Sequence, residues 1–314
     1  MGNQSSKSKT RRHKKNRLNI KMTTSNSNPS NRTKTFKKIN CAPSLNLQKH
    51  DFTCYTDDAL NRLKKYWNIR HPDRAITSNI SQEIWTQLKN NMSDVCDTES
   101  CWMRQKFMEN NLDDQFRNYV FAPKSPASWK KDKNEWLTSV DIVKVMKQFE
   151  HTHKNFAFLG PSPIDFDKRE TIDKCVWDDL CRFELSTHIK KGKTKIGIIF
   201  NTDPSYKSGS HWISMMIDIP KKIVYYFDSA GDKCPKQITA FAERVVEQGK
   251  KLNLDMKFLQ NHPFRHQKGN TECGVYALYF ITEMIKGVQD YDVFTKKRFT
   301  DKEIERYRRI FFTP

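Results

Sequence analysis

The chain has 314 residues, with 56 Lys and Arg against 36 Asp and Glu, and a formal net charge of +20 at pH 7. Twelve of the basic residues and none of the acidic ones fall within residues 1–40, so the rest of the chain carries only +8. No run approaches the roughly 18 apolar residues of a membrane-spanning helix, and the N-terminus lacks the apolar core of a secretory signal peptide. We therefore expect a soluble, intracellular protein. Its eight cysteines are too scattered for a small disulfide scaffold and are expected to be mostly reduced thiols.

Residues 1–40 are predicted to form a disordered basic tail, because so few apolar side chains cannot offset the entropy of ordering. A solvated arm is the simplest interpretation. "MGNQSSK" also fits the myristoylation pattern, with Gly2 as the acceptor and the basic residues behind it as a second membrane signal. "RRHKKNR" fits a nuclear address or a nucleic-acid tether that acts by counterion release. A membrane and nucleic acid are thus the partners that the tail suggests.

Residues 41–125 have the pattern of a helical N-terminal domain. "TDDALNRLKKYW" predicts a helix with Thr56 as its N-cap, and "SQEIWTQLKNNM" predicts a second helix. Cys96 and Cys101 stand five residues apart in "CDTESC", with no His pair nearby, so we interpret them as structural thiols rather than metal ligands. The sequence predicts no metal site and no cofactor.

A Pro- and Lys-rich break at 122–133 marks the start of a second domain, assigned to residues 126–314. "WLTSVDIVKVMKQFE" predicts a helix capped by Thr138 or Ser139, and its expected apolar stripe comprises Val140, Val143, Met146 and Phe149. Segments 195–203, 211–219 and 223–229 predict three successive strands, the last two joined as a hairpin by "PKK". A helix in 235–252, a strand near "MKFLQ", a helix at Cys273 and a last helix with the capping box "TDKE" complete an α+β domain.

The predicted hairpin brings together two polar side chains. His211 begins one strand and Asp228 ends its partner, and an antiparallel pair places these two positions side by side. Trp212 alternates to the other face and can shield the site from water. Taken singly, a strand-edge His is more often a surface residue and an Asp after a strand is more often a turn former. Their joint position indicates a functional pair.

Cys273 lies where a polar loop becomes an apolar helix. Backbone N–H groups and the dipole at a helix N-terminus favour a thiolate, which is the nucleophilic form of cysteine. Gln267 precedes it by six residues and carries an amide donor suited to an oxyanion, with the Cys273 N–H as the second donor. Gly274 would leave room for a substrate backbone. The alternative is a small core cysteine.

The motifs "FNTD", "GSHW", "YYFDSAG" and "RHQKGNTECGVY", in this order, resemble the ubiquitin-like-protein-specific and adenovirus-type clan of cysteine peptidases. Within that clan they are similar to the polyprotein-processing protease of African swine fever virus and its large-DNA-virus relatives. The resemblance implies a papain-like core, with a central helix against a mixed sheet. It also implies Cys273 as nucleophile, His211 as general base and then acid, Asp228 as the orienting residue and Gln267 in the oxyanion hole.

Two positions depart from the patterns of these relatives. Many clan members have Asp before the nucleophile where this chain has Glu272, and the viral relative has Asn where this chain has Asp228. The third catalytic position therefore tolerates an uncharged orienting group.

The resemblance implies hydrolysis after Gly-Gly motifs, and we expect the processing of viral core or capsid polyproteins during virion maturation. One alternative is a protease that releases a ubiquitin-like modifier from its conjugates. An alternative of another class is a basic, nucleic-acid-binding core component with a vestigial protease fold. The expected location is the virion and the host cytoplasm, or the nucleus if the tail is a nuclear signal.

Overall fold

The structure, a computed structural model, describes residues 36–44, 50–108 and 119–314. Gly2 and the basic run at 11–17, with the expectations attached to them, lie outside these residues. The assigned domain boundaries, 1–40, 41–125 and 126–314, stay predictions. No helix in the described part of the chain is both long enough and apolar enough to cross a membrane.

The region before residue 125 is helical, as its sequence predicts. Its helices are α1 (Asp57–Arg70), the short 3-10 helix η1 (Pro72–Arg74), α2 (Ser81–Asn91) and α3 (Glu99–Trp102). Thr56 is the N-cap of α1, because its side chain accepts a hydrogen bond from the backbone N–H of Ala59. Leu60 of α1 and Ile84 of α2 belong to a separate small core of this region.

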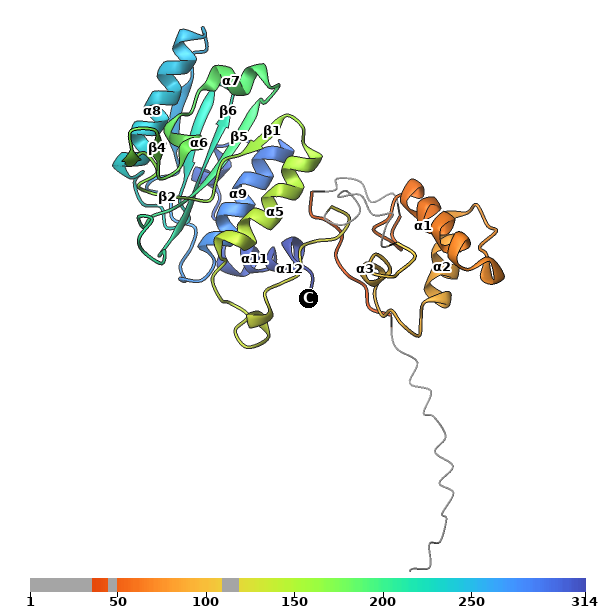
Figure 1. Ribbon diagram of the computed structural model, residues 1–314. Helices are drawn as coiled ribbons and strands as arrows, with labels where there is room; N and C mark the ends of the chain where they lie inside the picture. Colours follow the sequence, from red (N-terminus) through yellow and green to blue (C-terminus); the bar gives the residue numbers. More distant parts are fainter. Residues whose placement is uncertain (1–35, 45–49, 109–118) are drawn as a thin grey trace, which may run out of the picture. The chain divides into compact units, whose positions relative to one another are not determined.

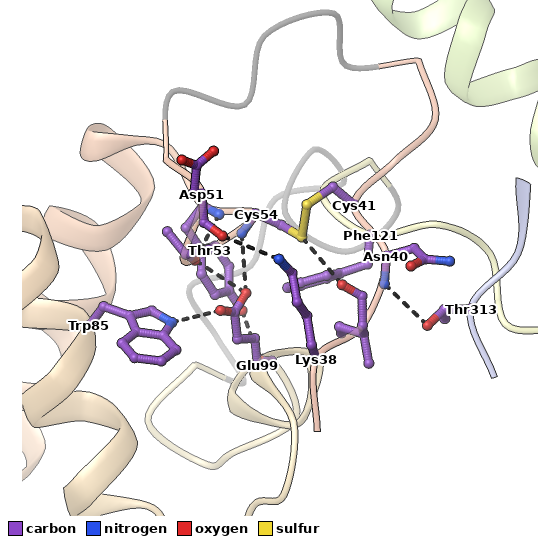
Figure 2. Close-up of a disulfide and its surroundings, with 12 residues drawn as sticks. Lys38, Asn40, Cys41, Asp51, Thr53, Cys54, Trp85, Glu99, Phe121 and Thr313 are labelled. Carbon is purple, nitrogen blue, oxygen red and sulfur yellow. Dashed lines mark hydrogen bonds between the residues drawn. A yellow bond between two sulfur atoms is a disulfide. The ribbon is translucent and has the colours of Figure 1, made fainter. Parts of the chain in front are cut away.

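The cysteines differ from the expectation of reduced thiols. Three disulfides are present among the described residues, Cys41–Cys54, Cys96–Cys101 and Cys175–Cys181, and the first is drawn in Figure 2. The prediction was therefore wrong for six of the eight cysteines, and only Cys234 and Cys273 are free. The fold brings the paired Cα atoms to 5.2, 5.5 and 6.3 Å, within the span of a disulfide. The density of cysteines along a chain does not reveal such proximity.

The second region is built on a six-stranded mixed sheet in the order β1-β5-β6-β7-β8, with β2 also pairing with β5. Its strands are β1 (Phe156–Phe158), β2 (Ser162–Pro163), β5 (Lys195–Asn201), β6 (Trp212–Asp218), β7 (Ile223–Phe227) and β8 (Lys257–Gln260). Strands β5, β6 and β7 are antiparallel neighbours, whereas β1, β2 and β8 pair in parallel. A separate pair consists of β3 (Arg169–Thr171) and β4 (Lys174–Cys175).

Helices cover both faces of this sheet (Figure 1). Helices α5 (Ser139–Thr152) and α9 (Cys273–Lys286) pack on one face, and α8 (Lys236–Lys251) packs on the other. Alternation along β5 explains the two cores, because Ile199 contributes to the first and Ile198 to the second. The other helices described after residue 119 are the 3-10 helix η2 (Ala127–Lys130), α6 (Asp178–Cys181), α7 (Leu185–Lys190), α10 (Val293–Lys296), α11 (Asp301–Glu305) and α12 (Arg308–Phe311). The α+β fold class is confirmed.

The buried face of α5 differs from the predicted stripe. Thr138 caps the helix as expected and forms a capping box with Asp141. However, Val140 is 58% exposed, and the buried apolar side chains are Ile142, Val145, Met146 and Phe149. Apolar residues occur on more than one side of this segment, so helical periodicity allowed two neighbouring stripes. Only contact with the sheet selects between them.

Gly197 permits the close approach of α9 to the sheet. A Cβ at this position of β5 would lie 2.9 Å from the Phe156 ring and 3.0 Å from Ile281 Cγ2 of α9. Both neighbours are fully buried and have little room to move. A strand residue without a side chain therefore sets the depth at which α9 packs.

We predict that Gly197→Ala lowers the free energy of unfolding by about 1–3 kcal/mol, the usual cost of overpacking a core. Urea unfolding followed by circular dichroism measures the change. Gly269→Ala is the matched control, because a Cβ there meets only Asp301 Oδ2 at an ordinary 3.5 Å. Equal stability of the two variants would contradict this account of Gly197.

Candidate active site

The hairpin of β6 and β7 places His211 beside Asp228, as the sequence predicts. His211 directly precedes β6 and Asp228 directly follows β7. The His211 Nε2 atom lies 2.6 Å from Asp228 Oδ1. The imidazole is 25% exposed and the carboxylate only 2%, so the pair has one accessible and one buried partner. The carboxylate can fix the ring while the other ring nitrogen remains available.

Asp228 is held by neighbours that have no catalytic chemistry of their own. Its Oδ1 accepts the N–H of Ala230 at 2.9 Å and its Oδ2 accepts the N–H of Asp232 at 3.3 Å. The buried amide of Asn261 accepts the Asp228 N–H at 2.8 Å and donates to the Asp228 carbonyl at 2.7 Å. The backbone is thus clamped on both sides of the carboxylate. A carboxylate fixed in this way orients the imidazole without moving itself.

The environment of His211 favours its protonated form. Burial acts to lower the pKa of His211, but the hydrogen bond to Asp228 and the interaction with the Cys273 side chain outweigh burial and raise this pKa to about 10. The imidazole ring therefore lies near both the carboxylate of Asp228 and the proposed nucleophile. An imidazolium between a carboxylate and a sulfur atom is the arrangement of an activated cysteine.

Cys273 is the first residue of α9, is 2% exposed and forms no disulfide. From Cys273 to Ile285 every residue of this helix is buried, which explains the apolar run in the sequence. The helix is held on all sides, so its first residue has a fixed position. The other free cysteine, Cys234, has no comparable partner, and burial raises its thiol pKa to about 11.

Gln267 is brought to the same region by the residue after Asp228. The Ser229 hydroxyl donates to Gln267 Oε1 at 2.6 Å, and the Ser229 carbonyl accepts the Gln267 N–H at 2.8 Å. The Gln267 side chain is almost fully buried. Because its oxygen is occupied, the amide NH₂ group is the part left to donate to a substrate.

Trp212 and Gly274 contact each other at the start of α9. The Trp212 indole N–H donates to the Leu137 carbonyl at 2.9 Å. A Cβ on Gly274 would lie 3.1 Å from both Trp212 Cδ1 and Leu137 Cβ. The space expected for a substrate backbone at Gly274 is therefore filled by these two side chains. Glycine is needed here so that the indole can pack directly on the helix.

Sequence reasoning missed three residues that support the site, namely Ser229, Asn261 and Leu137. Ser229 directly follows Asp228, and a hydroxyl at the end of a buried strand is a signal that could have identified it. Asn261 follows a short strand and is fully buried, yet nothing in its local pattern separates it from a turn former. Leu137 contributes a backbone carbonyl, which carries no sequence signal.

The α+β fold, together with a free cysteine at a helix start and a His–Asp pair whose carboxylate is buried, defines a cysteine peptidase. Residues 87–246, just over half of the chain, match the family described as the Vaccinia virus I7 processing peptidase. The chain belongs to this family. Residues 183–314 also match the C-terminal catalytic domain of the Ulp1 protease family, and this second match contains Cys273.

Individual relatives agree with this assignment. A protein of Acanthamoeba polyphaga mimivirus, named as a thiol protease, is 27% identical over 291 residues, which cover 87% of this chain and 92% of the relative. The SUMO-1 cysteine protease of African swine fever virus is 25% identical over 262 residues, covering 78% and 93%. A crystal structure of the African swine fever virus protease matches with a TM-score of 0.62 and 22% identity, over 88% of this chain and 97% of that one. The chain is thus a viral cysteine protease of the Ulp1 type.

We predict that Asp228→Asn moves the alkaline limb of the kcat/KM profile to lower pH by about one to three pH units. The wild-type His211 keeps its proton until the pH rises through about 10, and the charge and hydrogen bond of Asp228 sustain that value. Asp232→Asn removes an equal charge from an exposed neighbour and should leave the limb in place. An unchanged limb in Asp228→Asn would show that another group sets the state of the imidazole.

Gln267→Ala should lower kcat about 10²–10³-fold, as expected for the loss of one oxyanion donor. Ser229→Ala keeps the amide but frees its orientation, so the predicted loss is smaller, roughly tenfold, in line with one hydrogen bond of about 1.4 kcal/mol. The double variant should be no worse than Gln267→Ala alone, because Ser229 acts through that amide. Additive losses would contradict the assigned link.

Proposed function

We propose that the protein is an endopeptidase that hydrolyses peptide bonds after Gly-Gly and processes viral core or capsid polyproteins during virion maturation. The observation that carries the catalytic assignment is the 2.6 Å hydrogen bond between His211 and Asp228, in an imidazole whose pKa is also raised by the free thiol of Cys273. The presence of a free thiol, an imidazole and a carboxylate in one site argues against a vestigial fold. The site of action would be the virion and the assembly region of the host cytoplasm.

In the acylation step, the Cys273 thiolate attacks the carbonyl carbon of the scissile bond and a C–S bond forms. The carbonyl electron pair moves to oxygen, which receives hydrogen bonds from the Gln267 amide and the Cys273 N–H. His211, held as an imidazolium, gives its proton to the leaving amine as the C–N bond breaks. The acyl group remains on sulfur as a thioester.

In the deacylation step, the now neutral His211 takes a proton from a water molecule, which attacks the thioester carbonyl. The same two donors hold the oxyanion, the C–S bond breaks and the thiolate returns. Asp228 keeps the ring oriented through both proton transfers, and its charge offsets that of the imidazolium. The cycle restores every group to its starting state.

Glycine at the two positions before the scissile bond suits the surroundings of Cys273. The Trp212 indole is fixed by the Leu137 carbonyl and packs against Gly274, directly beside the nucleophile. Such a rigid ring cannot move aside for a bulky side chain, whereas glycine presents only backbone. The likeness to viral proteases supports a polyprotein as the source of the Gly-Gly site.

A second candidate is the release of a ubiquitin-like modifier through its C-terminal Gly-Gly. The match of residues 183–314 to the Ulp1 catalytic domain favours it, as does the name of the African swine fever virus relative, a SUMO-1 cysteine protease. Both candidates share the same acyl chemistry. They differ in whether a folded modifier must dock beside the cleaved bond.

A thiol-reactive Gly-Gly peptide probe should label Cys273 and no other cysteine. Mass spectrometry of the labelled peptides measures this. Cys273→Ala should abolish labelling and cleavage, whereas Cys234→Ala, which removes the other free thiol, should preserve both. Labelling that persists in Cys273→Ala would mean that the nucleophile is misassigned.

Cleavage assays with two substrates separate the candidates. One is an unfolded polypeptide with internal Gly-Gly sites, and the other is a ubiquitin-like modifier fused through its C-terminal Gly-Gly to a reporter. The proposal expects cleavage of the first. Release of the modifier without cleavage of internal sites would overturn the polyprotein assignment while leaving the catalytic residues in place.

A further inference from the structure

A buried ion pair lies at the residue directly before the nucleophile. Arg308 of α12 donates through Nε to both carboxylate oxygens of Glu272, at 3.1 and 2.8 Å. The two side chains are 5% and 6% exposed. Moving two charges out of water is costly, so a buried ion pair often adds little to the stability of a fold. The contacts of this pair therefore need to be considered for a role other than stability.

The remaining donors of Arg308 bind backbone carbonyls of two segments. Its NH1 donates to the Glu135 carbonyl at 2.8 Å, and its NH2 donates to the carbonyls of Thr271 and Asn134 at 3.2 and 3.4 Å. The guanidinium also lies 4.8 Å from the Trp129 ring centre. One segment leads directly to Cys273. The other leads to Leu137, which holds Trp212 against Gly274.

The backbone of Glu272 is unusual for the residue that starts a helix. An N-cap residue commonly has extended dihedrals and a side chain that accepts hydrogen bonds from the first N–H groups. Glu272 instead has φ −102° and ψ 5°, in the sparsely populated bridge region, and its side chain makes no capping hydrogen bond. Its carboxylate is turned to Arg308.

This orientation has a direct consequence for the oxyanion donor. The ψ angle of Glu272 sets the plane of the peptide unit whose N–H belongs to Cys273. A carboxylate that capped α9 would also place a negative charge beside the free N–H groups, where it would compete with a substrate oxyanion. Because Arg308 binds the carboxylate away from the helix start, the carboxylate neither caps α9 nor competes with the oxyanion.

We propose that the Glu272–Arg308 ion pair is a positioning device: it fixes the peptide unit before Cys273 and withdraws the Glu272 carboxylate from the α9 N-terminus, so that the Cys273 N–H is free to bind the substrate carbonyl oxygen. The inference rests on the proposed acyl-transfer function. Both residues act through the Cys273 amide and touch no reacting atom.

The test compares a reaction that forms an oxyanion with one that does not. Hydrolysis of p-nitrophenyl acetate and of a Gly-Gly peptide both pass through an oxyanion, whereas alkylation of Cys273 by iodoacetamide is a displacement at a saturated carbon. A defect in the amide donor slows only the first kind, while misfolding slows both. The simple ester needs no Gly-Gly recognition, so a failure of that specificity is seen separately.

For Arg308→Met we expect kcat to fall about 10- to 100-fold on both substrates, which is less than the loss of a whole oxyanion donor because the Cys273 N–H is misaligned and not removed. We expect KM and the iodoacetamide rate to change less than threefold. Arg309→Met, an exposed neighbour on α12, should have no effect. In the double variant Glu272→Gln/Arg308→Met no buried charge remains unpaired, so kcat should recover at least fivefold relative to Arg308→Met.

Two results would overturn the proposal. One is a parallel fall of kcat and alkylation in both Arg308 variants, which indicates a merely structural role. The other is a double variant no better than Arg308→Met, which shows that the unpaired carboxylate is not the cause. If Arg308→Met does not fold, Glu272→Gln/Arg308→Met and Glu272→Asp carry the same comparison. A lower kcat with unchanged alkylation, in the folded double variant or in Glu272→Asp, supports the positioning role. Wild-type kcat in the double variant, or equal losses in both reactions, contradicts it.

Discussion

The burial of α9 from Cys273 to Ile285 is the constraint on which the site depends. A helix that meets protein on every side can neither rotate nor slide, so the thiol at its first residue has one position. Gly197 on β5 sets the depth of packing, and the Tyr276 hydroxyl, bound to the Phe299 carbonyl and Asp301, ties the helix to the following segment. An immobile nucleophile allows the base to lie on a different element and still meet it.

The end of β7 serves both halves of the chemistry. Asp228 orients the imidazole that moves the proton, and Ser229, the next residue, orients the amide that can bind the oxyanion. Asn261 holds the backbone of Asp228 through two hydrogen bonds, so one rigid strand end positions both the His211 imidazole and the Gln267 amide. A shift of this strand end would therefore change the positions of both groups.

The sequence correctly predicted the features that depend on local patterns of residues. Alternation gave the strands, antiparallel pairing gave His211 beside Asp228, and the polar-to-apolar change gave Cys273 at a helix start. It did not predict features that depend on distant segments meeting. The disulfides, the clamp by Asn261 and the Arg308 contact all join residues whose spacing has no pattern. The predicted stripe of α5 was right for Met146 and Phe149 and wrong for Val140, because only contact with the sheet distinguishes two adjacent stripes.

The separation of the catalytic groups along the chain has a consequence for folding. His211 and Asp228 meet through a hairpin, a contact between near neighbours, whereas Cys273 reaches them only when α9 docks from far along the chain. Closing the long loop to Cys273 costs more chain entropy than closing the hairpin. A chain in which α9 has not docked would hold a base without a nucleophile. Proteolytic capacity thus requires the packed core and not the hairpin alone.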